Sequence, residues 1–339
     1  MPTENLLGKN LVELKELVAA NGYPRFAAQQ LSEWLYKRCV ASFEEMTNLS
    51  KQTRADLSEK YLIGRESYLS VQTSQDGTRK YLFPADNDRT VETAMIPELD
   101  RRTLCVSSQV GCRMGCQFCA TGQQPWGGNL SASQILNQIL SVDERPELSN
   151  LVFMGMGEPL DNIDALLRVL EVLTASWGLA MSPRRITVST IGVRSGLQRF
   201  LRESECHLAI SLHTPFEEER RVLLPGTGGL PLRDLFSLLR TVNWRGQRKL
   251  SFEYVVLAGV NDSPAHLEGL VKLLRGVPCL VNLIGYHPHE GASFERPKDA
   301  VLLKLRDKLG QAGILATLRA SRGMDIGAAC GLLSKTKKV

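Results

Sequence analysis

The chain has 339 residues, too many for one average domain and enough to bury a large core. An apolar fraction of 43% and a charged fraction of 23% are ordinary for a globular protein, and no apolar run is long enough to span a membrane. The first ten residues do not resemble a signal peptide, so we expect neither a membrane protein nor a secreted one. A net charge of +5 permits nucleic-acid binding without requiring it.

Residues 1–64 are predicted to be helical. An apolar face runs from Leu11 to Val18 and stops at Asn21-Gly22, a typical helix end. The sequence "SFEE", residues 42–45, is a capping box, and Ser50 is placed to cap the segment that follows it. We therefore expect a small N-terminal helical domain over residues 1–64.

Residues 65–97 alternate between apolar and polar side chains, which is typical of half-buried strands. Three such runs, "SYLSVQTS", "TRKYLFPA" and "RTVETAMIP", are separated by short turns, the first of them at Asp76-Gly77. The pattern predicts a short antiparallel β meander that connects the helical domain to the rest of the chain.

From residue 98 to 339 the chain repeats a strand followed by a helix. Seven apolar strands are expected: "TLCVSS", "NLVFMG", "RITVST", "HLAISLH", "LSFEYVVL", "CLVNLIGY" and "LATLRAS". Amphipathic segments such as "SASQILNQILSV" and "DNIDALLRVLEVL" lie between them, and this alternation favours a parallel sheet. We predict an α/β fold with a partial (β/α) barrel, in which the chemistry lies at the carboxyl ends of the strands.

Three of the eight cysteines, Cys112, Cys116 and Cys119, lie within "GCRMGCQFCATG" at residues 111–122. Thiolates are soft ligands for zinc, copper and iron–sulfur clusters, and a structural zinc site would need a second pair that this chain lacks. Three thiolates on a four-iron cluster leave one iron open to a small molecule. A redox thiol pair and buried core cysteines are the alternatives, but the neighbouring glycines favour the cluster.

Polar residues follow several of the predicted strands. "GMGEP" places Glu158 after the second strand, Ser189 ends the third, and Ser211-Leu212-His213 ends the fourth. Each signal is weak by itself, and His213 could equally be a hydrogen-bonded wall residue. Because the ends of parallel strands meet at one rim, we expect these groups to converge there.

The motifs together resemble a known family. CxxxCxxC in the first barrel loop is the signature of radical S-adenosylmethionine enzymes, and "TLCVSSQVGC", "FMGMGEPL", "AISLH" and "RGMDIGAACG" resemble the RlmN/Cfr group. Members of that group methylate adenine carbons in RNA. The resemblance covers nearly the whole chain, including "FEEMTNLSK" in the N-terminal region.

The resemblance implies one [4Fe-4S] cluster on Cys112, Cys116 and Cys119, whose open iron binds S-adenosylmethionine. The implied contacts to S-adenosylmethionine are Gly157, Glu158, Ser189, Ser211, Leu212 and His213. Many members carry Asn-Pro after the sixth strand, whereas this chain has His287-Pro288. Histidine can also donate a hydrogen bond, so we expect His287 to take that role.

The resemblance also implies a mechanism that uses two molecules of S-adenosylmethionine per turnover. Cys330 accepts a methyl group from the first, and a radical derived from the second activates that methyl group for addition to C2 of adenine. Cys105 then takes the C2 proton and forms a disulfide with Cys330, which releases the product. Glu92 matches a position that the family treats as a candidate proton acceptor.

The expected substrates are adenosine 2503 of 23S rRNA and adenosine 37 of tRNA, and the expected reductant is flavodoxin or ferredoxin. Arg25, Lys37 and Arg38 make the helical domain a candidate RNA platform. We expect a cytoplasmic monomer without membrane contact. A Cfr-type enzyme that methylates C8 shares every catalytic cysteine and is the alternative. Three other classes fit less well. A methylthiotransferase would need three further N-terminal cysteines for a second cluster, and a glycyl-radical activase would leave Cys105 and Cys330 unexplained. A non-catalytic RNA-binding iron–sulfur protein would have no use for an open iron.

Overall fold

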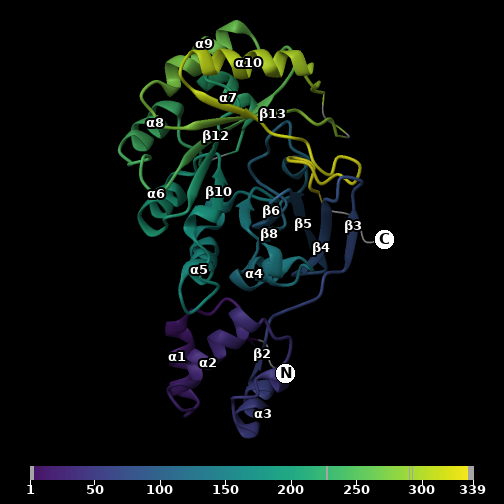
Figure 1. Cartoon of the computed structure of the whole chain (residues 1–339), viewed down its shortest axis with the longest axis vertical. Helices are drawn as coiled ribbons and strands as arrows, with labels where there is room; N and C mark the ends of the chain where they lie inside the picture. The colour runs from purple at the N-terminus through teal and green to yellow at the C-terminus, as the bar shows by residue number, and fades with distance from the viewer. Residues whose placement is uncertain (1–3, 227, 290, 292, 335–339) are drawn as a thin grey trace.

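A ten-stranded sheet organises the molecule (Figure 1). The computed structural model describes residues 4–226, 228–289, 291 and 293–334. The strand order is β14-β13-β12-β11-β10-β9-β6-β5-β4-β3, and the first seven strands of that order run parallel. They are β6 (Arg101–Cys105), β9 (Asn150–Phe153), β10 (Ile186–Thr190), β11 (His207–Ser211), β12 (Leu250–Val256), β13 (Leu280–Gly285) and β14 (Leu315–Leu318).

Helices follow the parallel strands and supply the apolar residues that cover the sheet. Val169, Leu197 and Leu235 come from three different helices, and all are fully buried. The helices are α4 (Ala132–Leu140), α5 (Ile163–Thr174), α6 (Arg194–Glu203), α7 (Glu217–Leu223), α8 (Leu232–Arg240), α9 (Pro264–Leu274) and α10 (Asp299–Gln311). The structure thus confirms the predicted α/β fold, with each of the seven expected strands in place.

The predicted meander forms β3 (Ser70–Thr73), β4 (Arg79–Ala85) and β5 (Arg89–Glu98). Gly77 has a φ of +82°, which the tight turn between β3 and β4 requires. Strand β5 then pairs antiparallel with β6, where Ala94 lies opposite Cys105. The meander therefore extends the sheet of the barrel, next to the strand that carries Cys105.

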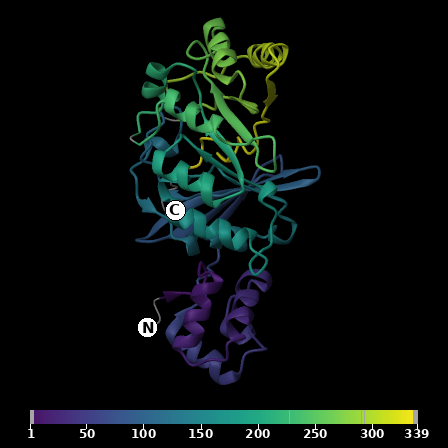
Figure 2. The ribbon, with the colours of Figure 1, turned by 90° about the vertical axis from the view of Figure 1, so that its left-hand side faces the viewer.

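The N-terminal residues form a helical lobe beside the barrel, seen in purple in Figure 2. Asn10 and Glu13 form a capping box at the start of α1, and Ser50 caps α3 through Thr53. The lobe contains β1 (Glu4–Asn5), α1 (Leu11–Ala20), α2 (Ala27–Ser32), a π-helical turn (Glu33–Arg38), a 3₁₀ turn (Phe43–Glu45), α3 (Lys51–Lys60) and β2 (Tyr61–Leu62). The "SFEE" capping box thus caps the start of a single 3₁₀ turn.

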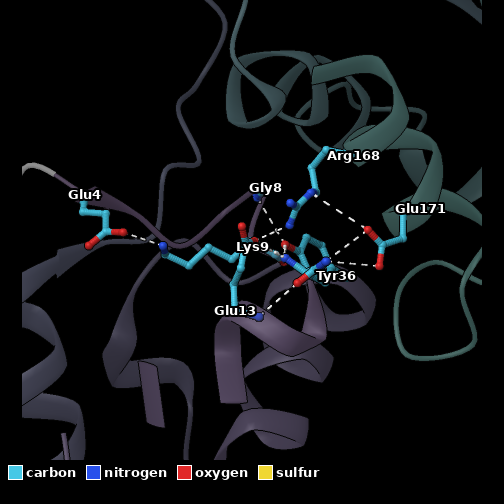
Figure 3. Close-up of polar contacts among 8 residues, drawn as sticks. Glu4, Gly8, Lys9, Glu13, Tyr36, Arg168 and Glu171 are labelled. Carbon is cyan, nitrogen blue, oxygen red and sulfur yellow. Dashed lines mark hydrogen bonds and ion pairs between the residues drawn. The ribbon is translucent and has the colours of Figure 1, made fainter. Parts of the chain in front are cut away.

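Polar side chains join the lobe to helix α5 of the barrel (Figure 3). Arg168 forms an ion pair with Glu13, and the Asn10 side-chain amide donates to Glu171 at 3.2 Å. The buried Tyr36 hydroxyl donates to the Lys9 carbonyl oxygen at 2.5 Å, which fixes the chain just before α1. Directional hydrogen bonds therefore set the orientation of the lobe on the barrel.

Short elements complete the chain, and residues 319–334 follow β14 without a helix or strand. The remaining pieces are β7 (Gln109–Val110), β8 (Gly128–Asn129) and 3₁₀ turns at Thr121–Gln123, Arg145–Glu147, Pro159–Asn162 and Pro183–Arg185. The C-terminal segment is tied to the loop after β7, because Ala120 donates to the Gly331 carbonyl at 2.8 Å. Within the described residues, no helix is long and apolar enough to cross a membrane.

Candidate active site

A cavity of about 1160 Å³ lies along the inner face of the barrel. The three clustered thiols, polar residues from four strand ends and the C-terminal segment all contribute to its wall. The predicted site residues on this wall are Cys105, Cys112, Cys116, Cys119, Gly157, Glu158, Ser189, Ser211, His213, His287 and Cys330. Two predicted residues, Leu212 and Glu92, are absent from that lining.

The loop that carries the three thiols is folded tightly. Gly111 and Gly115 have φ values of +76° and +61°, a region that favours glycine. A Cβ atom on Gly122 would lie 2.8 Å from the Cys116 backbone nitrogen. The two backbone segments therefore pack so closely at Gly122 that no side chain fits between them. This packing brings Cys112, Cys116 and Cys119 to one wall of the cavity.

The surroundings of these thiols suit an iron–sulfur cluster. The Cys119 sulfur accepts backbone hydrogen bonds from Thr121 and Gly122, and Cys112 accepts one from Met114. Such N–H donors stabilise thiolates and tune iron–sulfur clusters. Burial raises the pKa of Cys112 to about 12, so a positively charged centre would be needed to hold it as a thiolate.

The three thiols on this wall are the donor set that the loop offers to a metal centre. Among the residues that the structure describes, no group of three or more His, Cys, Asp or Glu side chains is arranged to hold one metal ion. In a four-iron cluster each thiolate binds a different iron, so its ligands stand apart around the cluster. Three thiols without a second cysteine pair fit a four-iron cluster that keeps one iron open, whereas a structural zinc site is closed by four ligands.

Glu158 is a buried carboxylate beside the thiols. Its side chain accepts hydrogen bonds from the backbone of Leu160 at 3.1 Å and of Ile191 at 3.0 Å, which fixes it at the rim. Burial raises the pKa of Glu158 to about 7, although these hydrogen bonds oppose the shift. It can therefore exchange a proton near neutral pH and accept a hydrogen bond from an amino group when ionised.

Residues at the carboxyl ends of β10 and β11 form the next part of the wall. The Ser189 and Ser211 hydroxyl oxygens lie 3.4 Å apart, and both side chains line the cavity. Leu212 is fully buried in the core, where its N–H donates to the Glu253 carbonyl at 3.0 Å and its own carbonyl accepts from Thr214 at 2.9 Å. A φ of +60° turns His213 into the wall, where its ring meets Phe118 edge to face with centroids 4.7 Å apart.

His213 has one defined tautomer. Its Nδ1 accepts a hydrogen bond from the Val255 backbone at 3.0 Å, so the neutral ring carries its proton on Nε2. Burial lowers the pKa of His213 to about 3, with Arg220 nearby adding to the effect. The ring is therefore neutral at physiological pH and can donate one hydrogen bond.

His287 occupies the position where the family resemblance led us to expect an asparagine. The side chain is buried, and its Nδ1 has no hydrogen-bond partner within the described part of the chain. Burial lowers the pKa of His287 to about 4, so the ring is neutral. A buried ring nitrogen without a partner next to a cavity is suited to a ligand contact.

Cys105 and Cys330 are far apart in the sequence but face the same cavity. Cys105 is the last residue of β6, and Cys330 lies in the C-terminal segment with its side chain exposed to the cavity. Desolvation raises the pKa of Cys105 to about 12 and that of Cys330 to about 11. Arg319 opposes both shifts, which places a positive charge close to both thiols.

Glu92 lies behind the cavity wall. Only 2% of its side chain is exposed, one oxygen pairs with Lys80 at 3.0 Å, and the other accepts from the Ser334 backbone at 2.8 Å. In this arrangement Glu92 connects β5 to the end of the C-terminal segment.

Three charged residues of the site were not identified from the sequence. Arg220 is buried and donates to the Ile191 carbonyl at 2.6 Å, beside Glu158 and Cys116. Glu253 and Arg319 line the cavity from β12 and from the residue after β14. A lone acid within the apolar run "LSFEYVVL" was the available signal for Glu253. Arg319 had no comparable signal, since an arginine after a strand is common.

The fold and site define a radical S-adenosylmethionine enzyme. Residues 106–273 match the family model of the radical SAM superfamily. The crystal structure of a radical SAM methyltransferase from Sphaerobacter thermophilus superposes with a TM-score of 0.91 at 39% identity, covering 98% of this chain and 99% of that one.

Further comparisons define the family within that class. Residues 4–63 match the model of the ribosomal RNA large subunit methyltransferase N-terminal domain. The chain is 53% identical to the probable dual-specificity RNA methyltransferase RlmN of Porphyromonas gingivalis strain W83, over 98% of this chain and 97% of that protein. It is 42% identical to the dual-specificity RNA methyltransferase RlmN of Geobacter sulfurreducens, over 97% and 91%. The chain belongs to the RlmN family of radical SAM RNA methyltransferases.

Proposed function

We propose that this chain methylates C2 of adenine in RNA and carries the transferred carbon on Cys330. The observation that supports this most directly is the placement of Cys330 and Cys105 on one cavity with Cys112, Cys116 and Cys119. A radical enzyme without a methyl carrier has no need for two further thiols there.

The chemistry explains why a radical is required. C2 of adenine is an electron-poor carbon between two ring nitrogens and does not attack a methyl donor as a nucleophile. When bound, the cluster supplies the electron that cleaves S-adenosylmethionine and generates a carbon radical. Cys112, Cys116 and Cys119 would hold the cluster, and Glu158, Ser189, Ser211, His213 and His287 would hold S-adenosylmethionine.

Cys330 performs the first half of the reaction. Its thiolate attacks the methyl group of one S-adenosylmethionine, forming S-methylcysteine and releasing S-adenosylhomocysteine. Arg319 assists because a nearby positive charge favours the thiolate. A second S-adenosylmethionine provides the radical that removes one hydrogen from this methyl group, and the resulting methylene radical adds to C2.

Cys105 performs the second half. Cys105 takes the C2 proton of the adduct, and the adduct gives up one electron, which the oxidised cluster would accept. The Cys105 sulfur then attacks the sulfur of Cys330. The bond between the Cys330 sulfur and the carbon breaks, the disulfide forms, and the proton that Cys105 took goes to the carbon, which leaves as a methyl group on the base. A two-electron reductant must restore the two thiols before the next turnover.

The RNA substrates are proposed from the relatives, whose names describe dual-specificity RNA methyltransferases. We propose adenosine 2503 of 23S rRNA and adenosine 37 of tRNA, with flavodoxin or ferredoxin as the electron donor. Two molecules of S-adenosylmethionine are consumed per methylated base. Since these RNAs are cytoplasmic, we propose that the protein acts in the cytoplasm, as a monomer.

Mass spectrometry of RNA tests the proposal. A host strain that lacks its own enzyme should gain 2-methyladenosine in ribosomal and transfer RNA when it expresses this chain. The Cys330→Ala variant is the matched control and should restore nothing. Appearance of 8-methyladenosine instead would identify the Cfr-type reaction, and unmodified RNA from an iron-loaded, folded protein would contradict the proposal.

A further inference from the structure

A buried carboxylate with one open oxygen faces the cavity from strand β12. Glu253 is 4% exposed. Its Oε1 accepts hydrogen bonds from Ser251 Oγ at 3.0 Å and from Asn282 Nδ2 at 2.8 Å, and Thr317 fixes that amide by donating to Asn282 Oδ1 at 2.7 Å. Its Oε2 has no hydrogen-bond partner within the described residues. A buried oxygen held this rigidly without a donor is expected to bind one from a ligand.

A guanidinium stands beside that oxygen. Arg319 Nη1 lies 3.7 Å from Glu253 Oε2, close enough for an ion pair but too far for a direct hydrogen bond. The same nitrogen contacts Met154 Sδ at 3.5 Å, and the Arg319 backbone donates to the Leu283 carbonyl at 3.0 Å. Arginine has five N–H donors, and the remaining ones are open to the cavity that Arg319 lines.

The pair therefore presents one acceptor and one donor side by side. Adenine offers the complementary pattern, since its exocyclic N6 amine donates and the adjacent ring nitrogen accepts. We propose that Glu253 accepts from N6 of the target adenine while Arg319 donates to N1, so that these two residues select the base. This inference rests on the proposed methylation of adenine.

The position of the two thiols selects the edge of the base. N1 is bonded directly to C2, whereas the other acceptor next to the amine, N7, lies on the far side of the ring. Arg319, Cys105 and Cys330 line the same cavity, and the charge of Arg319 acts on both thiols, so a base bound through N1 would bring C2 toward these sulfurs. Donation to N1 also withdraws electrons from C2, which favours addition of an electron-rich methylene radical.

The same pair would reject guanine. Guanine carries an oxygen where adenine has its amine and a proton on N1. Its oxygen would face the Glu253 carboxylate, and its N1 proton would face the Arg319 guanidinium. Both contacts are repulsive and leave buried polar groups unpaired, which is an effective way to discriminate between ligands.

The test combines a variant of the protein with a variant of the RNA. Anticodon stem-loop RNAs carry either adenosine or purine riboside at position 37, which differ only in the N6 amine. For the wild-type protein loaded with its cluster, loss of the amine should weaken binding at least about tenfold, since the hydrogen bond is to a charged group. In the Glu253→Gln variant, Ser251 and Asn282 still donate to the position of Oε1, so the amide oxygen of the new side chain takes that position. The amide NH₂ group, a donor, then stands where the acceptor Oε2 was. That variant should bind the two RNAs equally.

Arg319→Met provides a second arm that does not depend on the folding of the Glu253 variant. Wild-type protein should bind a 1-deazaadenosine stem-loop at least about tenfold more weakly than the adenosine one, and Arg319→Met should not distinguish them. A 7-deazaadenosine stem-loop should bind like adenosine throughout. Glu98→Gln, an exposed carboxylate on the cavity edge, is the matched control and should behave as wild type.

The outcomes separate this inference from the proposed function. If wild-type protein forms 2-methyladenosine but Glu253→Gln still prefers adenosine to purine riboside, the base-selecting role is wrong and the methylation stands. Sensitivity to 7-deazaadenosine in place of 1-deazaadenosine would also overturn it, because the other edge would then be bound. If wild-type protein forms no 2-methyladenosine, the proposed function itself fails.

Discussion

Glu92 in strand β5 accepts a hydrogen bond from the backbone N–H of Ser334 at 2.8 Å. The meander thereby holds the chain just beyond Cys330, and Lys80 neutralises the buried carboxylate from the neighbouring strand. The family resemblance proposes Glu92 as a proton acceptor, whereas its contacts favour an anchor for the segment that carries the methyl group.

Replacing Glu92 by Gln distinguishes these two roles. Loss of the ion pair with Lys80 should lower the free energy of unfolding by about 1–3 kcal/mol. An anchor also predicts faster hydrogen exchange over residues 328–334 and slower methylation of Cys330. Lys80→Met should share these effects. A proton acceptor instead predicts normal methylation of Cys330 followed by a stall after the base is linked, with Lys80→Met active.

The cluster ligands make a second prediction. Protein reconstituted without oxygen should hold one four-iron cluster, and alanine at Cys112, Cys116 or Cys119 should abolish it, because the remaining two thiolates cannot complete the site. Iron and sulfide content and the visible spectrum measure this. Cys206→Ala is the control, since Cys206 is buried away from the cavity and should leave the cluster intact. A full cluster in any of the three loop variants would show that the ligands are wrong.

Glu158 should make the binding of S-adenosylmethionine pH-dependent. Only the ionised carboxylate can accept a hydrogen bond from the amino group of the ligand, and burial raises the pKa of Glu158 to about 7. Affinity should therefore be full above pH 7 and fall as the pH drops through that value. Glu158→Gln should bind at least about tenfold more weakly at pH 8 and lose this pH dependence. Calorimetry on cluster-loaded protein measures both, and an unchanged affinity would reduce "GMGEP" to an ordinary turn.

The sequence predicted the barrel well because its strands are continuous apolar runs, a local signal. Strand β5 pairs with β6 so that Ala94 lies opposite Cys105, and this pairing joins the meander to the barrel sheet. That register depends on contacts that no local sequence pattern encodes. The same limit applies to the contact between Glu92 and Ser334, which lie far apart in the chain. Resemblance to known motifs identified the thiols of the site. No residue pattern around Arg319 indicated that β14 would place its side chain beside β12.

The helical lobe is predicted to bind RNA through Arg25, Lys37 and Arg38, whose side chains are exposed. Phe26, with 64% of its surface exposed, offers a stacking face next to Arg25. Changing the three basic residues to Gln should weaken RNA binding and reduce the slope of log affinity against log salt by about 2–3, as three phosphate contacts would. Cleavage of S-adenosylmethionine should not change. Fluorescence anisotropy at several salt concentrations measures the slope.

Lys15→Gln with Lys51→Gln is the control for that experiment, since both lysines are exposed elsewhere on the lobe. If this pair lowers the slope as much per residue as the triple variant does, the lobe attracts RNA by net charge alone. An unchanged affinity in the triple variant would place the RNA platform elsewhere.

The two cavity thiols make the most specific prediction. If Cys105 resolves a covalent intermediate, its removal should not stop the steps that precede it. Cys105→Ala should still methylate Cys330, cleave S-adenosylmethionine and add the methylene group to adenine. It should then stall, because no thiol remains to take the C2 proton and form the disulfide. The expected product is protein linked to RNA through Cys330, a shifted band in gel electrophoresis that ribonuclease trims. Cys330→Ala should give neither the link nor a methylated base, and normal turnover by either variant would refute the two-thiol mechanism.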